Sequence, residues 1–284
     1  MKSTIGLLLI LFFLLIAQVS IASTQFTGVA SQAMGGTGRA AVIPNEVAFL
    51  NPASFVSVRG YNLATAYRDF QTLDKGSTRN FAIHASENQT DSMFPLAITY
   101  LKTRDINSGA YGVREDIHLT TGQEIFGNVA FGIDVARYTD TPEGGKEETE
   151  WDAKVGFLYA PMDNLGLGLV FTNLLVTDLE HLKRGVEVGV NYLFMQFFRA
   201  ALDVTYQMED NESDESVVMF GIEHMYFKQI ALRAGAKWDA PINQNYWTLG
   251  LAWNAPKISF GYAFEKNVAE TDEYGHSVDL RIYF

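Results

Sequence analysis

Apolar and polar side chains alternate at every second residue in segment after segment of this chain, and this pattern limits the fold more than any other feature. In residues 129–136 the odd positions hold Val, Phe, Ile and Val, and the even positions hold Ala, Gly, Asp and Ala. A period of two is typical of β-strands with two different faces. The clearest segments are 129–137, 151–159, 165–171, 186–192, 198–206, 218–223, 230–238, 247–253, 258–265 and 278–284. Weaker ones are 61–69, 78–86, 94–103 and 113–123, so we expect about fourteen strands.

The connections between these segments alternate in length. Short ones are expected at 124–128, 161–164, 194–196, 226–229 and 254–257, and the stretch 87–93 is longer than this pattern requires. Long, mostly polar ones are expected at 70–77, 104–112, 139–150, 174–185, 208–216, 239–245 and 265–274. Tight periplasmic turns and longer external loops are typical of antiparallel barrels in the outer membrane. The sequence therefore predicts an all-β transmembrane barrel over residues 61–284, and a soluble β-sandwich or barrel buried on one face is the alternative.

Composition excludes several other classes of protein. The chain has 284 residues, of which 48% are hydrophobic, and this apolar content argues against disorder. It has no Cys, which excludes disulfides and Cys-ligated zinc. A net charge of −12 argues against a nucleic-acid partner.

The first 22 residues predict a cleaved signal peptide. Lys2 precedes an apolar run within residues 5–17, and Ser20-Ile21-Ala22 offers small residues for cleavage after Ala22. The alternative is a transmembrane anchor, but about 13 apolar residues are fewer than the roughly 20 that a spanning helix needs. We expect export to the outer membrane of a Gram-negative bacterium, with lipid, lipopolysaccharide and the barrel-assembly machinery as partners.

Charged side chains on the strands indicate which face is turned inward. Because a Lys or Arg facing lipid near mid-bilayer costs roughly 2–4 kcal/mol, we expect these charges to point into the lumen. They are Asp134, Lys154, Glu187, Arg199, Asp203, Glu223, Arg233, Lys237, Asp279 and Arg281. With Asp152 added, six acidic groups face five basic ones, which favours paired charges around a filled lumen over an ion-selective pore.

Aromatic residues near the strand ends are expected to form interfacial belts on the lipid side. These are Tyr138, Trp151, Tyr159, Tyr192, Tyr206, Trp238, Trp247, Trp253 and Tyr262.

Residues 23–60 lack sustained alternation and are rich in small residues. Gly36, Gly38 and Ala41 fit a GxGxxA dinucleotide-binding pattern, but no strand precedes it and no βαβ unit follows. Glycines here instead indicate a backbone that turns tightly and packs closely, because Gly adopts conformations that other residues avoid. We expect this segment to act as a plug inside the barrel.

Met34-Gly35-Gly36, followed by Asn51-Pro52-Ala53, resembles the N-terminal segment of FadL-type outer-membrane transport proteins and of the related PorV-type family. The resemblance implies a 14-stranded barrel and, from the FadL type, a hatch inside it. The chain departs from the pattern at Ser54, where Gly is common, and in its external loops of about 7–12 residues. The last strand ends at Phe284, which resembles the terminal aromatic that the assembly machinery reads in outer-membrane proteins.

No motif indicates catalysis. The five His residues form no HExxH or other metal spacing, so we expect no enzyme activity, no cofactor and no metal. Acidic clusters in the long loops are interpreted as solvated, or as binding cations that bridge lipopolysaccharide. Two functions remain open: passage of hydrophobic small molecules through a plugged barrel, which is FadL-like, or a PorV-like structural, assembly or secretion subunit with a protein partner.

Overall fold

The computed structural model describes residues 26–72, 76–89, 95–106, 112–142, 145–175, 182–208, 215–240, 243–270 and 272–284. The signal peptide predicted over residues 1–22 lies outside these ranges, as do residues 23–25 of the predicted plug, so both stay predictions.

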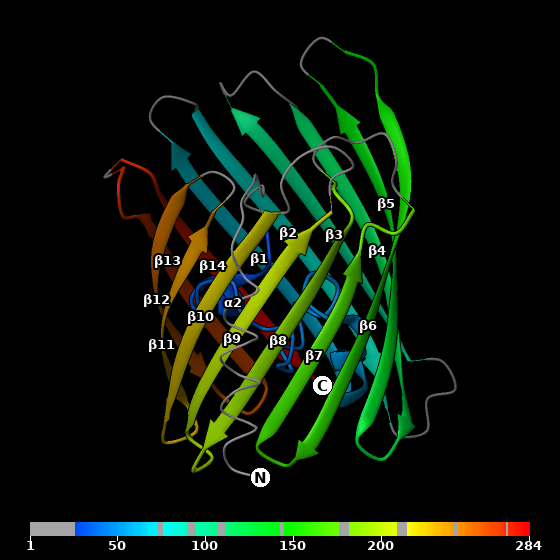
Figure 1. Ribbon diagram of the computed structural model, residues 1–284, viewed down its shortest axis with the longest axis vertical. Helices are drawn as coiled ribbons and strands as arrows, with labels where there is room; N and C mark the ends of the chain where they lie inside the picture. Colours follow the sequence, from blue (N-terminus) through cyan, green and yellow to red (C-terminus); the bar gives the residue numbers. More distant parts are fainter. Residues whose placement is uncertain are drawn as a thin grey trace.

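Fourteen strands form one closed antiparallel barrel (Figure 1). They are β1 (Gly60–Thr72), β2 (Gly76–Asn88), β3 (Leu96–Ile106), β4 (Val113–Phe126), β5 (Val129–Thr141), β6 (Glu148–Met162), β7 (Leu165–Thr172), β8 (Gly185–Phe194), β9 (Phe198–Gln207), β10 (Glu215–Tyr226), β11 (Ile230–Asp239), β12 (Gln244–Asn254), β13 (Ile258–Asn267) and β14 (Tyr274–Tyr283). Each strand pairs with its neighbours in sequence, and β1 pairs with β14 to close the ring. The prediction of an all-β antiparallel barrel of about fourteen strands is confirmed.

The two ends of the barrel differ in their connections. At one end, here the turn end, strands are joined by the short stretches 127–128, 163–164, 195–197, 227–229 and 255–257, and the partly described stretch 89–95 also lies there. At the other, the loop end, most connections are shorter than the sequence predicts, and the loop expected at 139–150 spans only 142–147. The reason is that the pairing of β5 with β6 continues to Asp140 and Glu148. Backbone pairing persists there although the side chains no longer alternate.

Strand length varies around the barrel. Strands β1 to β6 have 11 to 15 residues, whereas β7 to β14 have 8 to 12. At the loop end, β2 to β6 rise beyond β8 to β12 (Figure 1). The rim of the barrel is therefore higher on one side.

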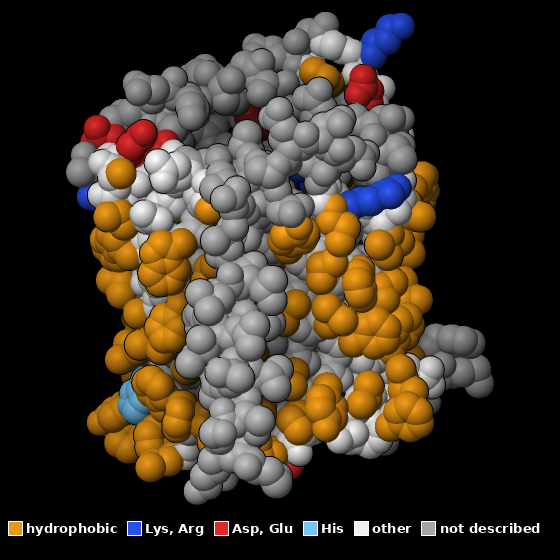
Figure 2. All heavy atoms as spheres, in the orientation of Figure 1, with side chains coloured by type: hydrophobic (Ala, Val, Ile, Leu, Met, Phe, Trp, Pro, Cys, Tyr) orange, Lys and Arg blue, Asp and Glu red, His pale blue; other side chains and the backbone are white. Residues whose placement is uncertain are grey.

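The two faces of each strand differ as the alternation predicts. In β5, Ala130, Asp134 and Ala136 are buried, while Val135 on the opposite face is exposed. Apolar side chains cover the outer wall and acidic ones gather near the loop end (Figure 2).

Tyr138 corrects one expectation about the aromatic belts. It is buried in the lumen, 7% exposed, rather than placed on the outer wall. The physical reason is its parity, because Tyr138 shares the inward face of β5 with Asp134 and Ala136. Position near a strand end was a weaker indicator than the period of two.

The N-terminal segment, residues 26–59, runs through the interior of the barrel (Figure 1). It contains a single helical turn, α2 (Val29–Gln32), against β13 and β14, and a 3₁₀ helix, η1 (Pro52–Ser57), against β4, β5 and β6. Among the residues that the structure describes, no helix is long and apolar enough to cross a membrane.

A set of inward-facing glycines, here the glycine seat, brings the N-terminal segment close to the wall. They pair across the sheet as Gly122, Gly132 and Gly156 on β4 to β6, as Gly168 and Gly189 on β7 and β8, and as Gly221 and Gly235 on β10 and β11. A Cβ at Gly132 would fall on the backbone of Pro52 and Ala53, and one at Gly168 on the Arg39 carbonyl. The segment therefore packs backbone against backbone, which side chains at these positions would prevent.

We predict that Gly132→Ala destabilises the folded protein by about 1–3 kcal/mol, because the added methyl overpacks its contact with η1. Gly127→Ala is the matched control, since the nearest atom to a Cβ there, Glu124 Oε1, is 3.9 Å away. The measurement is urea-induced unfolding followed by tryptophan fluorescence. Equal unfolding midpoints for the two variants would contradict the role of the glycine seat in packing the N-terminal segment against the wall.

Candidate functional site

Glu46 fixes the start of the N-terminal segment. Its fully buried carboxylate accepts hydrogen bonds from the backbone N–H of Ala30 at 2.8 Å and of Ser31 at 3.0 Å. These groups open α2, where N–H groups lack partners within the helix. A residue about fifteen positions away in sequence thus satisfies the helix and folds the segment back on itself.

The Asn-Pro-Ala motif connects η1 to the rest of the segment. The Asn51 amide donates to the carbonyls of Arg39, at 2.7 Å, and Phe157, at 3.0 Å, and its oxygen accepts from Ala53 N–H. Pro52 then occupies the first helical turn, where its missing N–H is not needed. Asn51 therefore joins three elements: η1, the chain near Arg39 and strand β6.

Met34-Gly35-Gly36 forms the turn after α2. Gly35 and Gly36 have φ values of 71° and 92°, a region that favours glycine. Gly35 N–H donates to the Thr248 hydroxyl on β12 at 2.9 Å, and that hydroxyl donates to the Ala33 carbonyl at 3.1 Å. Both sequence motifs thus attach the segment to the wall.

A buried group of charges, here the Arg39 cluster, consists of Arg39, Glu187 on β8 and Asp203 on β9. Arg39 Nε donates to Glu187 Oε2 at 2.8 Å. Asp203 Oδ2 accepts from the backbone N–H of Gly38 at 2.6 Å and of Arg39 at 2.8 Å. The segment is held here by charge-assisted hydrogen bonds, which are stronger than neutral ones.

The other predicted lumen charges also lie on the inner face. Lys154 donates to the carbonyls of Ala48 and Phe49 in the segment, and Asp279 accepts from the Asn45 amide at 3.2 Å. The remaining contacts are Arg281 to Asp279, Arg199 and Arg233 to Glu223, Lys237 to Glu265, and Asp134 to His118. Charged groups are thus paired with opposite charges on the same strand or on nearby strands, and Lys154 and Asp279 also bind polar groups of the segment.

Three charged residues at this site were not predicted from the sequence. Arg68 and Glu265 form a buried pair at 2.8 Å. Both occupy inward positions of their strands, so the alternation of the sequence could have placed them in the lumen. Arg39 lies in a segment without periodicity, and nothing in the sequence indicates that it binds β8.

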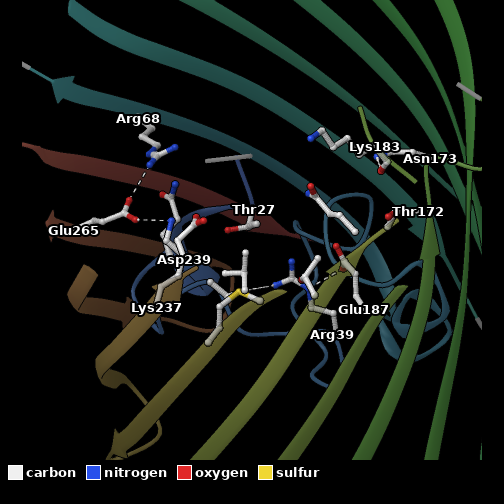
Figure 3. A pocket seen from close by; sticks show the side chains of 17 residues that line it. Thr27, Arg39, Arg68, Thr172, Asn173, Lys183, Glu187, Lys237, Asp239 and Glu265 are labelled. Atoms are coloured by element: carbon white, nitrogen blue, oxygen red, sulfur yellow. Dashed lines mark hydrogen bonds and ion pairs between the residues drawn. The ribbon is translucent and has the colours of Figure 1, made fainter. Parts of the chain in front are cut away.

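An outer cavity of about 790 Å³ lies on the loop side of the N-terminal segment (Figure 3). Its lining is strongly polar, with Arg39 and Glu187 on one side and the Arg68, Glu265 and Lys237 group on the other. Such a lining suits water and polar groups better than a hydrocarbon.

A smaller aromatic chamber adjoins the outer cavity, with which it shares Thr172 and Asn173. Its walls include Phe26, Phe49, Leu101, His118, Tyr138 and Leu182, together with the charged side chains of Arg114, Asp116 and Lys154. The rings of Phe26, Phe49, His118 and Tyr138 meet edge to face in succession, with centroids 5.3, 5.6 and 5.9 Å apart. This arrangement suits a small apolar or aromatic guest, since edge-to-face contacts are favourable between rings.

No protein-family model matches the chain, and no curated protein sequence resembles it significantly. Solved structures do resemble it. The monoaromatic hydrocarbon channel CymD has a TM-score of 0.68 and 13% identity, covering 92% of this chain and 99% of that one. The toluene transporter TbuX of Ralstonia pickettii has a TM-score of 0.68 and 12% identity, covering 90% and 98%. A FadL homologue of Pseudomonas aeruginosa has a TM-score of 0.62 and 13% identity, covering 94% and 100%.

This chain has the fold of the FadL-family hydrocarbon transporters. At such identities the likeness is one of fold, and it confirms at that level the resemblance drawn from Met34-Gly35-Gly36 and Asn51-Pro52-Ala53. These structural neighbours are transport channels rather than enzymes.

We predict that docking of the N-terminal segment weakens as pH rises through about 7. Burial, and then the Asp279 carboxylate, raise the pKa of Glu46 from 4.5 to about 7. Because the folded pKa exceeds the unfolded one, the stabilisation is fully present below about pH 4.5 and is lost as pH passes 7. The shift corresponds to about 3 kcal/mol.

Protease cleavage within the N-terminal segment, measured between pH 5 and 8, checks this prediction. Cleavage should increase with pH in the wild type and become independent of pH in Glu46→Gln, which stays neutral. The same pH dependence in both proteins would exclude Glu46 as its source.

Proposed function

We propose that this protein is an outer-membrane channel that passes small apolar molecules, and that the N-terminal segment is its plug. The aromatic chamber carries this proposal, because it places a row of four aromatic rings inside a barrel whose fold is that of hydrocarbon channels. Export through a cleaved signal peptide and recognition of Phe284 by the assembly machinery belong to the same proposal. Phe284 follows β14 at the turn end, where its N–H donates to the Tyr61 carbonyl.

The outer surface supports a place in the membrane. Leu249, Leu251 and Phe260 are about half exposed on neighbouring strands, which would be costly in water and is favourable in lipid. Strands of 8 to 15 residues match the roughly 9–11 residues that a tilted strand needs to span a bilayer. Lipid and lipopolysaccharide are therefore its proposed surroundings.

A structural or assembly subunit with a protein partner is the second candidate function. The connection lengths at the loop end favour it, because the longest, between β7 and β8, comprises only residues 173–184. Short loops leave little material to build a substrate site outside the barrel. Purification in mild detergent with a stoichiometric partner, together with unchanged hydrocarbon uptake in a deletion strain, would establish this alternative.

We predict that Phe49→Ala lowers the uptake rate of toluene at low concentration by about 2- to 10-fold. Removing the central ring of the chamber forfeits aromatic contacts worth about 0.5–1.5 kcal/mol. Phe131→Ala is the matched control, because Phe131 pairs with Phe157 on the outer wall and does not line the chamber. Uptake is measured with labelled toluene in a deletion strain carrying each variant. Equal uptake with and without the wild-type protein would refute the channel.

The membrane placement has a test of its own. Leu249→Arg should destabilise the barrel in lipid vesicles by about 2–4 kcal/mol, since the charge then faces hydrocarbon. Glu147→Arg, in the connection between β5 and β6, is the control. The free energies of unfolding of the two variants are compared by urea-induced unfolding in vesicles. If Leu249→Arg does not lower the free energy of unfolding, this surface faces water.

A further inference from the structure

A second large cavity, here the inner basin, lies at the turn end of the barrel. It encloses about 990 Å³ and its lining includes Val42, Leu158, Leu165, Leu193, Phe197 and Met225. Ala40 of the N-terminal segment and Gly166 also line it, whereas Gly36 and Arg39 line the outer cavity. The two cavities therefore meet opposite sides of one short stretch of chain.

The order of inward side chains along the strands shows how thin this partition is. On β8, Glu187 lines the outer cavity, Gly189 contacts Arg39 and Ala40, and Asn191 lines the inner basin. On β10, Met219, Gly221 and Glu223 follow the same order. Four residues of a strand span about 13 Å, so residues 36–40 separate the cavities with little more than one layer of backbone.

The Arg39 cluster holds this stretch in place. Asp203 binds two successive backbone N–H groups, Glu187 binds the guanidinium, and Asn51 binds the Arg39 carbonyl. Asp203 Oδ1 is buried and has no hydrogen-bond partner within the described part of the chain. A buried carboxylate oxygen without a partner is costly, and this cost offsets part of what the bonds through Oδ2 contribute.

Glycines make release feasible on the wall side. Gly168 and Gly189 face the stretch from β7 and β8, so no side chains interlock with it there. Gly36 and Gly38 lie within it, with φ values of 92° and 150°, which gives its backbone freedom to rearrange.

We infer that residues 36–40 are the gate of the channel and that the Arg39 cluster controls its opening. Moving this stretch joins the outer cavity to the inner basin along the inner faces of β7 to β10, which gives an axial path through the barrel. The apolar inner basin then receives the apolar molecule before it leaves at the turn end. This inference rests on the proposed channel function and adds the residues that control passage.

Ion conductance in planar lipid bilayers tests the gate without any hydrocarbon. Arg39→Met removes the cluster's cation and Asp203→Ala removes the acceptor of the two N–H groups, and each should raise the frequency of open events at least tenfold over the wild type. Arg281→Met is the matched control, because Arg281 is also a buried cation, 3.1 Å from the Asp279 carboxylate, but belongs to the wall and lines neither the outer cavity nor the inner basin. It should conduct like the wild type.

Folding of each variant is checked by its heat-dependent mobility in electrophoresis. If Arg39→Met and Asp203→Ala do not fold, Arg39→Lys decides the matter, since it keeps the charge but loses the forked hydrogen bonds, and it should raise open events severalfold. Conductance unchanged in all folded Arg39 and Asp203 variants overturns the inference. An equal rise in Arg281→Met also overturns it, because the effect would then be a general loosening of the lumen.

Toluene uptake separates this inference from the proposed function. If the Arg39 variants conduct ions but the wild-type protein does not increase toluene uptake, the gate is supported and the proposed substrate class is refuted. If the wild-type protein increases toluene uptake but the Arg39 variants conduct no more than the wild type, the channel function is supported and this path is refuted.

Discussion

A closed sheet of fourteen strands encloses more space than its inward side chains fill, because about eight strands already give an interior of side-chain size. What occupies that space determines whether the barrel is an open pore or a closed one. Here the chain's own residues 26–59 occupy it, and they fit because Gly132, Gly168 and Gly221 remove side chains from the wall at the level of contact. The N-terminal segment therefore fits inside the barrel only because the glycine seat leaves room for its backbone.

Apolar clusters and polar or charged contacts together hold the segment. Buried ion pairs contribute little net stability, because desolvation offsets their attraction, but removing one partner is costly. The Arg39 cluster and Glu46 therefore fix where the segment lies more than how strongly it adheres. A segment held in this way has a well-defined position in the lumen.

The fold could be predicted from the sequence because each strand repeats one physical rule: the outer face is apolar and the inner face is small, polar or charged. The same rule located the ten lumen charges, and applied strictly it would also have placed Tyr138, Arg68 and Glu265 inside. The N-terminal segment has no period, so its contacts depend on residues far away in sequence. Neither the meeting of Arg39 with Glu187 nor the capping of α2 by Glu46 has a local signal.

The uneven strand lengths give the barrel a slanted mouth. At the loop end, the hairpins of β2 to β6 extend further than the strands β8 to β12, so the rim is high on one side and low on the other (Figure 1). The outer cavity draws most of its lining from β7 to β13, beneath that low rim. Access to the outer cavity from the loop end is therefore more open over β8 to β12 than over β2 to β6, so a molecule bound to the tall hairpins would leave the cavity accessible.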